Sequence, residues 1–311
     1  MHPLKIVVDK TAGCSYEPIE DFFGFNTGID ILTERKSLLG MGANHPSISE
    51  KVKEYSDYFK MFLIPEEPNS FYQPGAADGI YDIEKSFDLI FTICKYTKQW
   101  REEYFNIDKN KRIYIFTPWS LEYSYPDQEK TIPVYWTGHT LGSELQRAIY
   151  RSIELFKGII VDAGKKQIVS HLEKMIINGK SKISITYGLL FVEEHKRFSV
   201  KSLPYWDKNE AFKCIDLGLM PQMKTRIHEA ALSKSIILHK RDEWNIIEDW
   251  YTPNEDFIYF DDENDLVDKI NEINNNYDSY KYISDNAYNK IINNYTTAHF
   301  IQKYILPNTK Q

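Results

Sequence analysis

The chain contains 311 residues, of which 42% are hydrophobic and 27% are charged. This composition is ordinary for a globular protein and excludes long disordered or fibrous stretches. The formal net charge is −7, and no run of Lys or Arg is dense enough to follow a phosphate backbone. Nucleic acid is therefore not expected as a partner.

The length exceeds that of one ordinary domain and favours two domains of about 150 residues each. The first residues, Met1–Asp9, contain an apolar run that is too short for a signal peptide. No stretch of about eighteen apolar residues occurs, so we expect no transmembrane segment and a cytoplasmic location. The three cysteines form no CxxC pair, which argues against a disulfide framework or a zinc site.

The first half of the chain alternates short apolar runs with stretches of helical composition. Such runs are typical of strands that are buried on both faces of a parallel sheet. The predicted strands are Lys5–Val8, Tyr58–Ile64, Phe87–Ile93 and Arg112–Phe116, and the predicted helices are Ser47–Tyr55 and Thr97–Tyr104. This order predicts an α/β, Rossmann-like, doubly wound domain over residues 1–125.

A polar, Pro-containing segment at residues 119–130 marks the predicted domain junction. Beyond it we predict an amphipathic helix from Leu145 and strands at Ile132–Trp136, Gly158–Asp162, Ile183–Phe191 and Ser235–His239. These elements form a second Rossmann-like domain over residues 126–285. We expect the two domains to face a cleft, and a C-terminal helix in residues 286–311 to pack back on the first domain.

The stretch Pro221–Leu232 (PQMKTRIHEAAL) is the most informative for function. A helix that begins near Lys224 would direct its free N–H groups and its positive dipole end towards an anion, with Lys224 and Arg226 in its first turn. Glu229 follows on the same helix, and a carboxylate can accept hydrogen bonds from both hydroxyls of a ribose. This spacing indicates a nucleoside-diphosphate site. The alternative is a solvated helix face, which is the commoner origin of an isolated charge pattern.

The stretch resembles the C-terminal donor-binding domain of group 1 glycosyltransferases of the GT-B fold, whose donor helix reads Arg-x-x-Glu-Ala. Here that text runs from Arg226 to Ala230, and the apolar strand Ile258–Phe260 and the helix start Asp265-Leu266 follow as in the family. The resemblance covers about residues 220–300. It implies that Glu229 holds the donor ribose and that Lys224 or Arg226 neutralises the diphosphate leaving group, so that no metal or other cofactor is expected. Pro221 stands where many retaining members carry another Glu, so the stereochemistry is left open.

Two further groups of residues are candidates for the site. Gly138 and His139 follow the first strand of the second domain, where GT-B enzymes place a loop that faces the donor phosphates. On the acceptor side, a base is needed to activate a hydroxyl, and the candidates are Glu66, Glu67, Asp9 and His45. For each of these residues the alternative is an ordinary loop or capping role.

The resulting hypothesis is a glycosyltransferase that moves a sugar from a nucleotide sugar to a hydroxyl acceptor, on a glycan or another glycoconjugate. Two alternatives stay open at this point. One is a nucleotide-sugar epimerase or hydrolase on the same fold, and the other is a non-catalytic nucleotide-binding partner subunit. Fold alone does not separate them.

Overall fold

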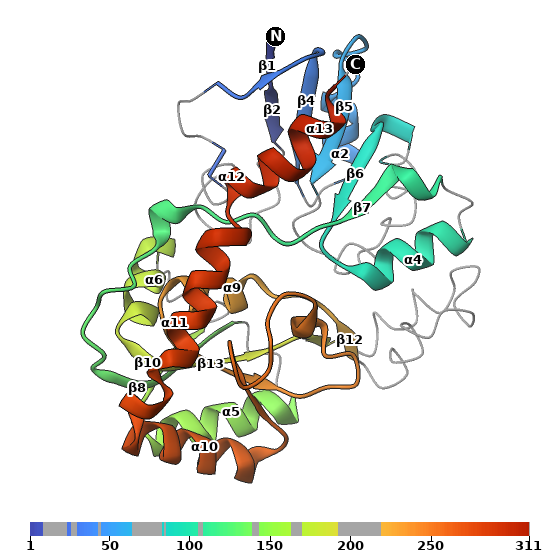
Figure 1. Cartoon of the computed structure of the whole chain (residues 1–311). Helices are drawn as coiled ribbons and strands as arrows, with labels where there is room; N and C mark the ends of the chain where they lie inside the picture. The colour runs from blue at the N-terminus through green and yellow to red at the C-terminus, as the bar shows by residue number, and fades with distance from the viewer. Residues whose placement is uncertain are drawn as a thin grey trace. The chain divides into compact units, whose positions relative to one another are not determined.

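The computed structural model describes residues 1–8, 24–25, 30–42, 45–63, 83, 85–104, 108–138, 143–162, 170–191 and 219–310. The chain divides into two compact units. The first unit comprises Met1–Trp119, Leu190–Gln222 and Thr297–Gln311, and the second comprises Ser120–Leu189 and Met223–Thr296. Each unit is built around its own parallel sheet (Figure 1).

The sheet of the first unit has its strands adjacent in the order β2-β4-β5-β6-β7, and all neighbours are parallel. The strands are β2 (Lys5–Val8), β4 (Ser37–Met41), β5 (Phe59–Leu63), β6 (Leu89–Thr92) and β7 (Arg112–Tyr114). Every residue of β4 and β6 is buried, as expected for strands that are covered on both faces. A separate antiparallel pair joins β1 (His2–Pro3) to β3 (Leu32–Thr33).

The first unit also contains helical segments and a further strand. These are α2 (His45–Lys51), α4 (Lys95–Tyr104), η2 (Lys109–Lys111), α12 (Thr297–Phe300), the π-helical turn η7 (Ile301–Ile305), α13 (Leu306–Asn308) and β12 (Leu219–Pro221). Strand β12 pairs with β11 (Leu189–Phe191), which starts at the last residue of a second-unit segment. The ring of Phe300 lies 5.0 Å from that of Phe91, and the ring of Tyr304 lies 5.8 Å from that of Phe116. The end of the chain therefore packs on the first sheet through aromatic contacts.

The sheet of the second unit has the order β14-β13-β10-β8-β9, and its neighbours are parallel as well. Its strands are β8 (Ile132–Gly138), β9 (Ile159–Asp162), β10 (Ser181–Tyr187), β13 (Ile236–Lys240) and β14 (Ile258–Phe260). The prediction of two α/β units with parallel sheets is therefore confirmed.

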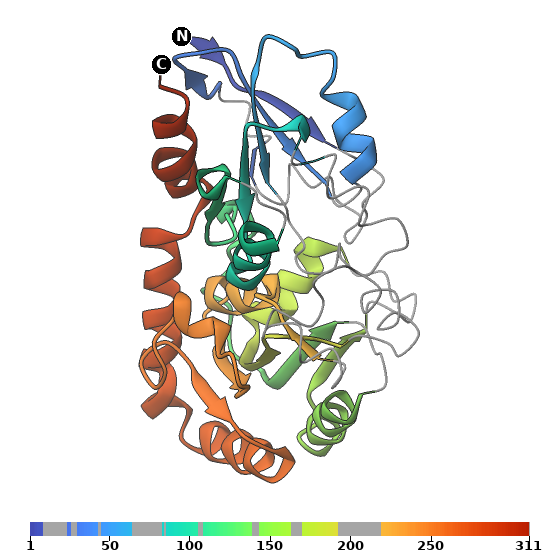
Figure 2. The same ribbon diagram turned by 90° about the vertical axis from the view of Figure 1, so that its right-hand side faces the viewer.

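Helices cover both faces of the second sheet. They are α5 (Glu144–Leu155), α6 (His171–Gly179), α9 (Thr225–Leu232), α10 (Glu263–Asn275) and α11 (Tyr277–Asn294), with short turns η3 (Leu121–Tyr123) and η6 (Ile246–Asp249). In Figure 2 the strands separate α5 and α10, which contact each other, from α6 and α9. Ser143 and Ser170 begin α5 and α6 with reciprocal capping boxes, which satisfy N–H groups that a helix start leaves open.

Three details of the predicted elements need correction. Helix α6 and strand β4 were not predicted from the sequence. Gly138 is the last residue of β8 rather than a loop residue, because the strand continues two residues beyond Trp136. The C-terminal helix predicted in residues 286–311 is interrupted between α11 and α12, where the N–H of Thr297 donates to the carbonyl of Trp119 instead of continuing the helix.

Candidate functional site

The carboxyl edge of the second sheet contains a switch in chain direction between β8 and β10. The chain leaves β8 for β9 on one side and then returns to β10 on the other side. In open α/β sheets such a switch point forms a crevice beyond the strand ends, and ligands bind there. Gly138 ends β8 and Tyr187 ends β10, so these two residues border the switch point.

Arg226 reaches this edge from the first turn of α9. Its guanidinium carbon lies 5.7 Å from the centroid of the Trp136 ring and 5.2 Å from that of the Tyr187 ring. A Cβ atom on Gly138 would lie only 2.5 Å from Nη1 of Arg226 and 3.0 Å from its Nη2. The guanidinium is thus held by two aromatic rings, in a space that exists because residue 138 is glycine.

The Nη1 atom of Arg226 is buried, and no hydrogen-bond acceptor contacts it within the described ranges. Aromatic faces attract the cation, but they do not replace an oxygen acceptor for its N–H groups. A buried donor without an acceptor costs about 1–3 kcal/mol, and more when it is charged. An anion beside Nη1 would remove this cost, and a guanidinium binds phosphate oxygens in pairs.

The start of α9 adds a second source of positive potential. Lys224 is the N-cap residue, and its side chain makes no capping hydrogen bond to the first turn. The first N–H groups of a helix lack intrahelical partners and, with the helix dipole, attract anions. At the start of α5, Gln146 connects to the site by donating to the hydroxyl of Tyr187 over 3.4 Å.

Glu229 lies one turn further along α9 and is only 1% exposed. Its Oε1 accepts a hydrogen bond from Nζ of Lys174 on α6, at 2.6 Å. Burial alone would raise the pKa of the Glu229 carboxyl, but the charges of Lys174, His171 and Arg226 hold this pKa below its usual value. Glu229 is therefore an ionised, buried partner of Lys174.

Comparison with known families identifies the part of the chain that carries this site. Residues 199–305 match the family profile described as glycosyl transferase-like. This segment is therefore similar to the glycosyltransferases that the profile describes. The match includes Lys224, Arg226 and Glu229, and it bears out the resemblance seen in the Arg-x-x-Glu-Ala text. No curated protein matches the sequence significantly.

Solved structures extend the likeness to the fold of the whole chain. HepE from Anabaena, in complex with UDP and glucose, superposes with a TM-score of 0.58 at 7% identity, over 98% of this chain and 98% of HepE. An S. aureus TarM variant, in complex with fondaparinux, alpha-GlcNAc-glycerol and UDP, gives 0.56 at 11% identity, over 88% of this chain. The pneumococcal O-GlcNAc transferase GtfA, with UDP and GlcNAc, gives 0.55 at 10% identity, also over 88%.

This chain spans 55% of the length of TarM and 57% of that of GtfA. At these identities the superpositions establish the GT-B glycosyltransferase fold, and the GT-B prediction is confirmed.

The structure places only part of the predicted glycosyltransferase site. It brings Gly138 and Arg226 into contact, with Lys224 and Glu229 on the same helix. His139 lies outside the described residues, as do Glu66, Glu67 and Asp9. His45 begins α2, but its side chain is not among the described ones.

Two residues of the site were missed by the sequence analysis. Lys174 pairs with Glu229 from 55 positions away in the chain, and Tyr187 flanks Arg226 from the end of β10. The signal for Lys174 is local: Ser170 followed by Glu173 is a capping box that announces the helix on which Lys174 lies. No sequence pattern predicts that Lys174 pairs with Glu229.

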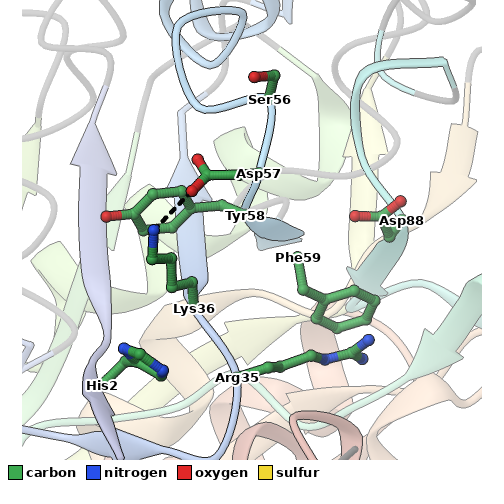
Figure 3. A pocket seen from close by; sticks show the side chains of 8 residues that line it. All are labelled: His2, Arg35, Lys36, Ser56, Asp57, Tyr58, Phe59 and Asp88. Atoms are coloured by element: carbon green, nitrogen blue, oxygen red, sulfur yellow. Dashed lines mark hydrogen bonds and ion pairs between the residues drawn. The ribbon is translucent and has the colours of Figure 1, made fainter.

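A hollow of about 590 Å³ lies in the first unit, at the amino ends of the strands rather than at their carboxyl ends. Figure 3 shows the side chains that line it. It is lined by His2, Arg35, Lys36, Ser56, Asp57, Tyr58, Phe59 and Asp88. The guanidinium of Arg35 stacks 3.3 Å from the Phe59 ring centroid and donates to the carbonyl of Asn308, while Lys36 pairs with Asp57. The hydrogen bond from Arg35 ties the C-terminal segment to this part of the first unit.

Among the residues that the structure describes, no group of three or more His, Cys, Asp or Glu side chains is arranged to hold a metal ion. No described helix combines the length and the apolar character that crossing a membrane requires.

Proposed function

We propose that this chain transfers a sugar from a nucleoside-diphosphate sugar to a hydroxyl group of a glycan or another glycoconjugate, in the cytoplasm. The observation that carries the proposal is the buried Nη1 atom of Arg226, which has no acceptor among the described residues and lies at the switch point of the second sheet. A diphosphate is the anion that fits this position, because the start of α9 and Lys224 add positive potential beside it.

In the proposed reaction, the bond from the sugar C1 to the diphosphate oxygen breaks, and a new bond forms between C1 and the acceptor oxygen. The electron pair of the broken bond stays on the diphosphate, so negative charge grows there in the transition state. Arg226, with Lys224, would stabilise that charge from a fixed position that needs no reorganisation. The acceptor proton goes to a base, for which Glu66, Glu67 and His45 stay the proposed candidates.

Glu229 remains the proposed partner of the donor ribose. Its ion pair with Lys174 supports this role in one respect, because it keeps the carboxylate ionised although it is buried. Gly138 supports close approach of the phosphates, and His139 is a proposed further donor to them. UDP is the first nucleotide to test, since HepE, TarM and GtfA were each crystallised with UDP.

The test is a turnover assay with the full chain, UDP-glucose and UDP-N-acetylglucosamine, and a set of glycan, glycolipid and glycerol acceptors. We expect release of UDP that depends on the acceptor, with the acceptor gaining the mass of one sugar. Isomerisation of the sugar would instead identify an epimerase. Release of UDP in the absence of an acceptor would identify a hydrolase. Binding without any turnover would identify a non-catalytic subunit.

A further inference from the structure

A second pair of buried polar atoms lies beside the strand end that carries Tyr187. His239, in β13, is completely buried, and its Nδ1 pairs with Oγ1 of Thr186 at 2.8 Å. Its other ring nitrogen, Nε2, is buried and has no hydrogen-bond partner in the described part of the chain. Thr186 and His239 are register partners in the parallel pair β10 and β13, so both lie towards the same carboxyl edge.

The second buried polar atom is Oδ2 of Asp242, which lies in the turn that follows β13. Its Oδ1 accepts hydrogen bonds from the backbone N–H groups of Trp244 and Asn245, each at 2.8 Å. Its Oδ2 is buried and, among the described residues, has no partner. The turn therefore fixes the carboxylate and leaves one of its oxygens for another group.

Both atoms converge on Gly188, the residue that follows Tyr187. A Cβ atom on Gly188 would lie 3.4 Å from Oδ2 of Asp242 and 3.5 Å from Nε2 of His239, with Cγ2 of Ile246 at 3.0 Å. The two polar atoms thus border one small space beside the backbone of Gly188. Gly188 directly follows Tyr187, whose ring contacts Arg226, so this space and the proposed diphosphate position lie at the same carboxyl edge of the sheet.

We propose that Asp242 and His239 together bind one hydroxyl group of the sugar that the nucleotide donor carries. This inference rests on the proposed function. A hydroxyl can donate to Oδ2 of Asp242, and it can donate to or accept from Nε2 of His239, so it suits either tautomer of the imidazole. A phosphate has no proton to offer a carboxylate and would be repelled by it. The restricted space suits a single hydroxyl better than the edge of a nucleotide base.

The electrostatics of the turn agree with this assignment. Burial raises the pKa of Asp242, although the N–H groups of Asn245 and Trp244 act in the opposite direction. A further hydrogen-bond donor stabilises a buried carboxylate more than an exposed one, because it offsets the free-energy cost of removing the charge from water. A donor sugar would supply that hydrogen bond each time it binds.

The test compares Asp242→Asn with the wild-type chain. Asparagine keeps the oxygen that accepts the two backbone bonds, but it replaces Oδ2 by an NH2 group, which cannot accept. By calorimetry we expect the affinity for the matching nucleotide sugar to fall about 10- to 100-fold, as for a lost hydrogen bond to a charged group. Affinity for the free nucleoside diphosphate should stay within about twofold. Asp261→Asn, at an exposed carboxylate after β14, is the matched control and should change neither affinity.

Gly188→Ala provides a second variant that introduces no polar change. Its methyl group would occupy the space between Asp242 and His239. This variant too should lower the affinity for the nucleotide sugar and leave the affinity for the free nucleoside diphosphate unchanged. Unchanged affinity for the sugar nucleotide in both variants would overturn the proposal and leave the transferase function standing. An equal loss for the free diphosphate would assign the space to the nucleoside and also overturn it. If the wild-type chain bound none of UDP, GDP, ADP and TDP, the proposed function itself would fail.

Discussion

Replacement of Gly138 by alanine would perturb the proposed diphosphate position through a single methyl group. The new Cβ would lie 2.5 Å from Nη1 of Arg226 and 2.9 Å from Cζ2 of Trp136. An ordinary contact needs about 3.5 Å, so the guanidinium must move by about 1 Å. The indole of Trp136 is completely buried and has little freedom to yield, so most of the movement falls on the flexible arginine.

The expected loss follows from the length of a charge-assisted hydrogen bond. Such bonds to a phosphate oxygen are about 2.7–2.9 Å long, and a displacement of about 1 Å breaks them. Each lost bond costs about 1.5–3 kcal/mol, which corresponds to a loss of affinity of about 10- to 150-fold. Crowding against Trp136 should also destabilise the fold, by about 1–3 kcal/mol.

The assay is calorimetric titration of the Gly138→Ala chain with UDP, together with thermal unfolding. Gly158→Ala is the matched control, because a Cβ there would lie 2.4 Å from the main-chain oxygen of Val134, near the amino end of the sheet. The control should lose stability and keep its affinity, whereas Gly138→Ala should lose affinity. A folded Gly138→Ala chain that binds UDP as tightly as the wild type would refute the assignment of Arg226 to the diphosphate.

Three further outcomes are expected. In urea unfolding, Lys174→Met should lower the free energy of unfolding by about 3–5 kcal/mol, because it leaves the buried Glu229 charge unpaired. The control Lys180→Met, at an exposed residue, should change this free energy by less than about 0.5 kcal/mol. Burial lowers the pKa of His228 from 6.5 to about 4, so between these pH values the unfolded chain binds a proton that the folded chain does not. Stability should therefore fall by up to about 3 kcal/mol as pH drops through that window, and an imidazole NMR titration of His228 near 6.5 would contradict this reasoning. Turnover should survive a chelator, because Arg226 is proposed to supply the positive charge that a metal ion would otherwise provide. Complete loss of turnover that Mn²⁺ restores would contradict this prediction.

Much of the candidate site at the carboxyl edge of the second sheet could be predicted, because its sequence signals are local. The apolar run that starts at Ile132 and ends in Thr137-Gly138 identified the strand, and the cations near Arg226 marked the helix start. The strand β4 was missed because Ser37 and Gly40 interrupt its apolar run, although both are buried in the sheet. Burial on both faces removes the alternation that would otherwise reveal such a strand.

The partners of the site residues could not be predicted, because they come from distant parts of the chain. Helix periodicity places Glu229 on one face of α9. It does not predict whether this face is exposed to solvent or packs against the helix that carries Lys174. The same holds for Gly188 and Asp242, which meet only because β10 and β13 are neighbours in the sheet. Pairings of this kind depend on strand order, which the sequence pattern does not specify.

A crystal structure of the chain with bound UDP tests the central claim most directly. We expect diphosphate oxygens within hydrogen-bond distance of Nη1 of Arg226, at the carboxyl ends of β8 and β10, with the ribose towards Glu229. Diphosphate bound elsewhere, with the guanidinium still between Trp136 and Tyr187 and without an anion, would contradict the account.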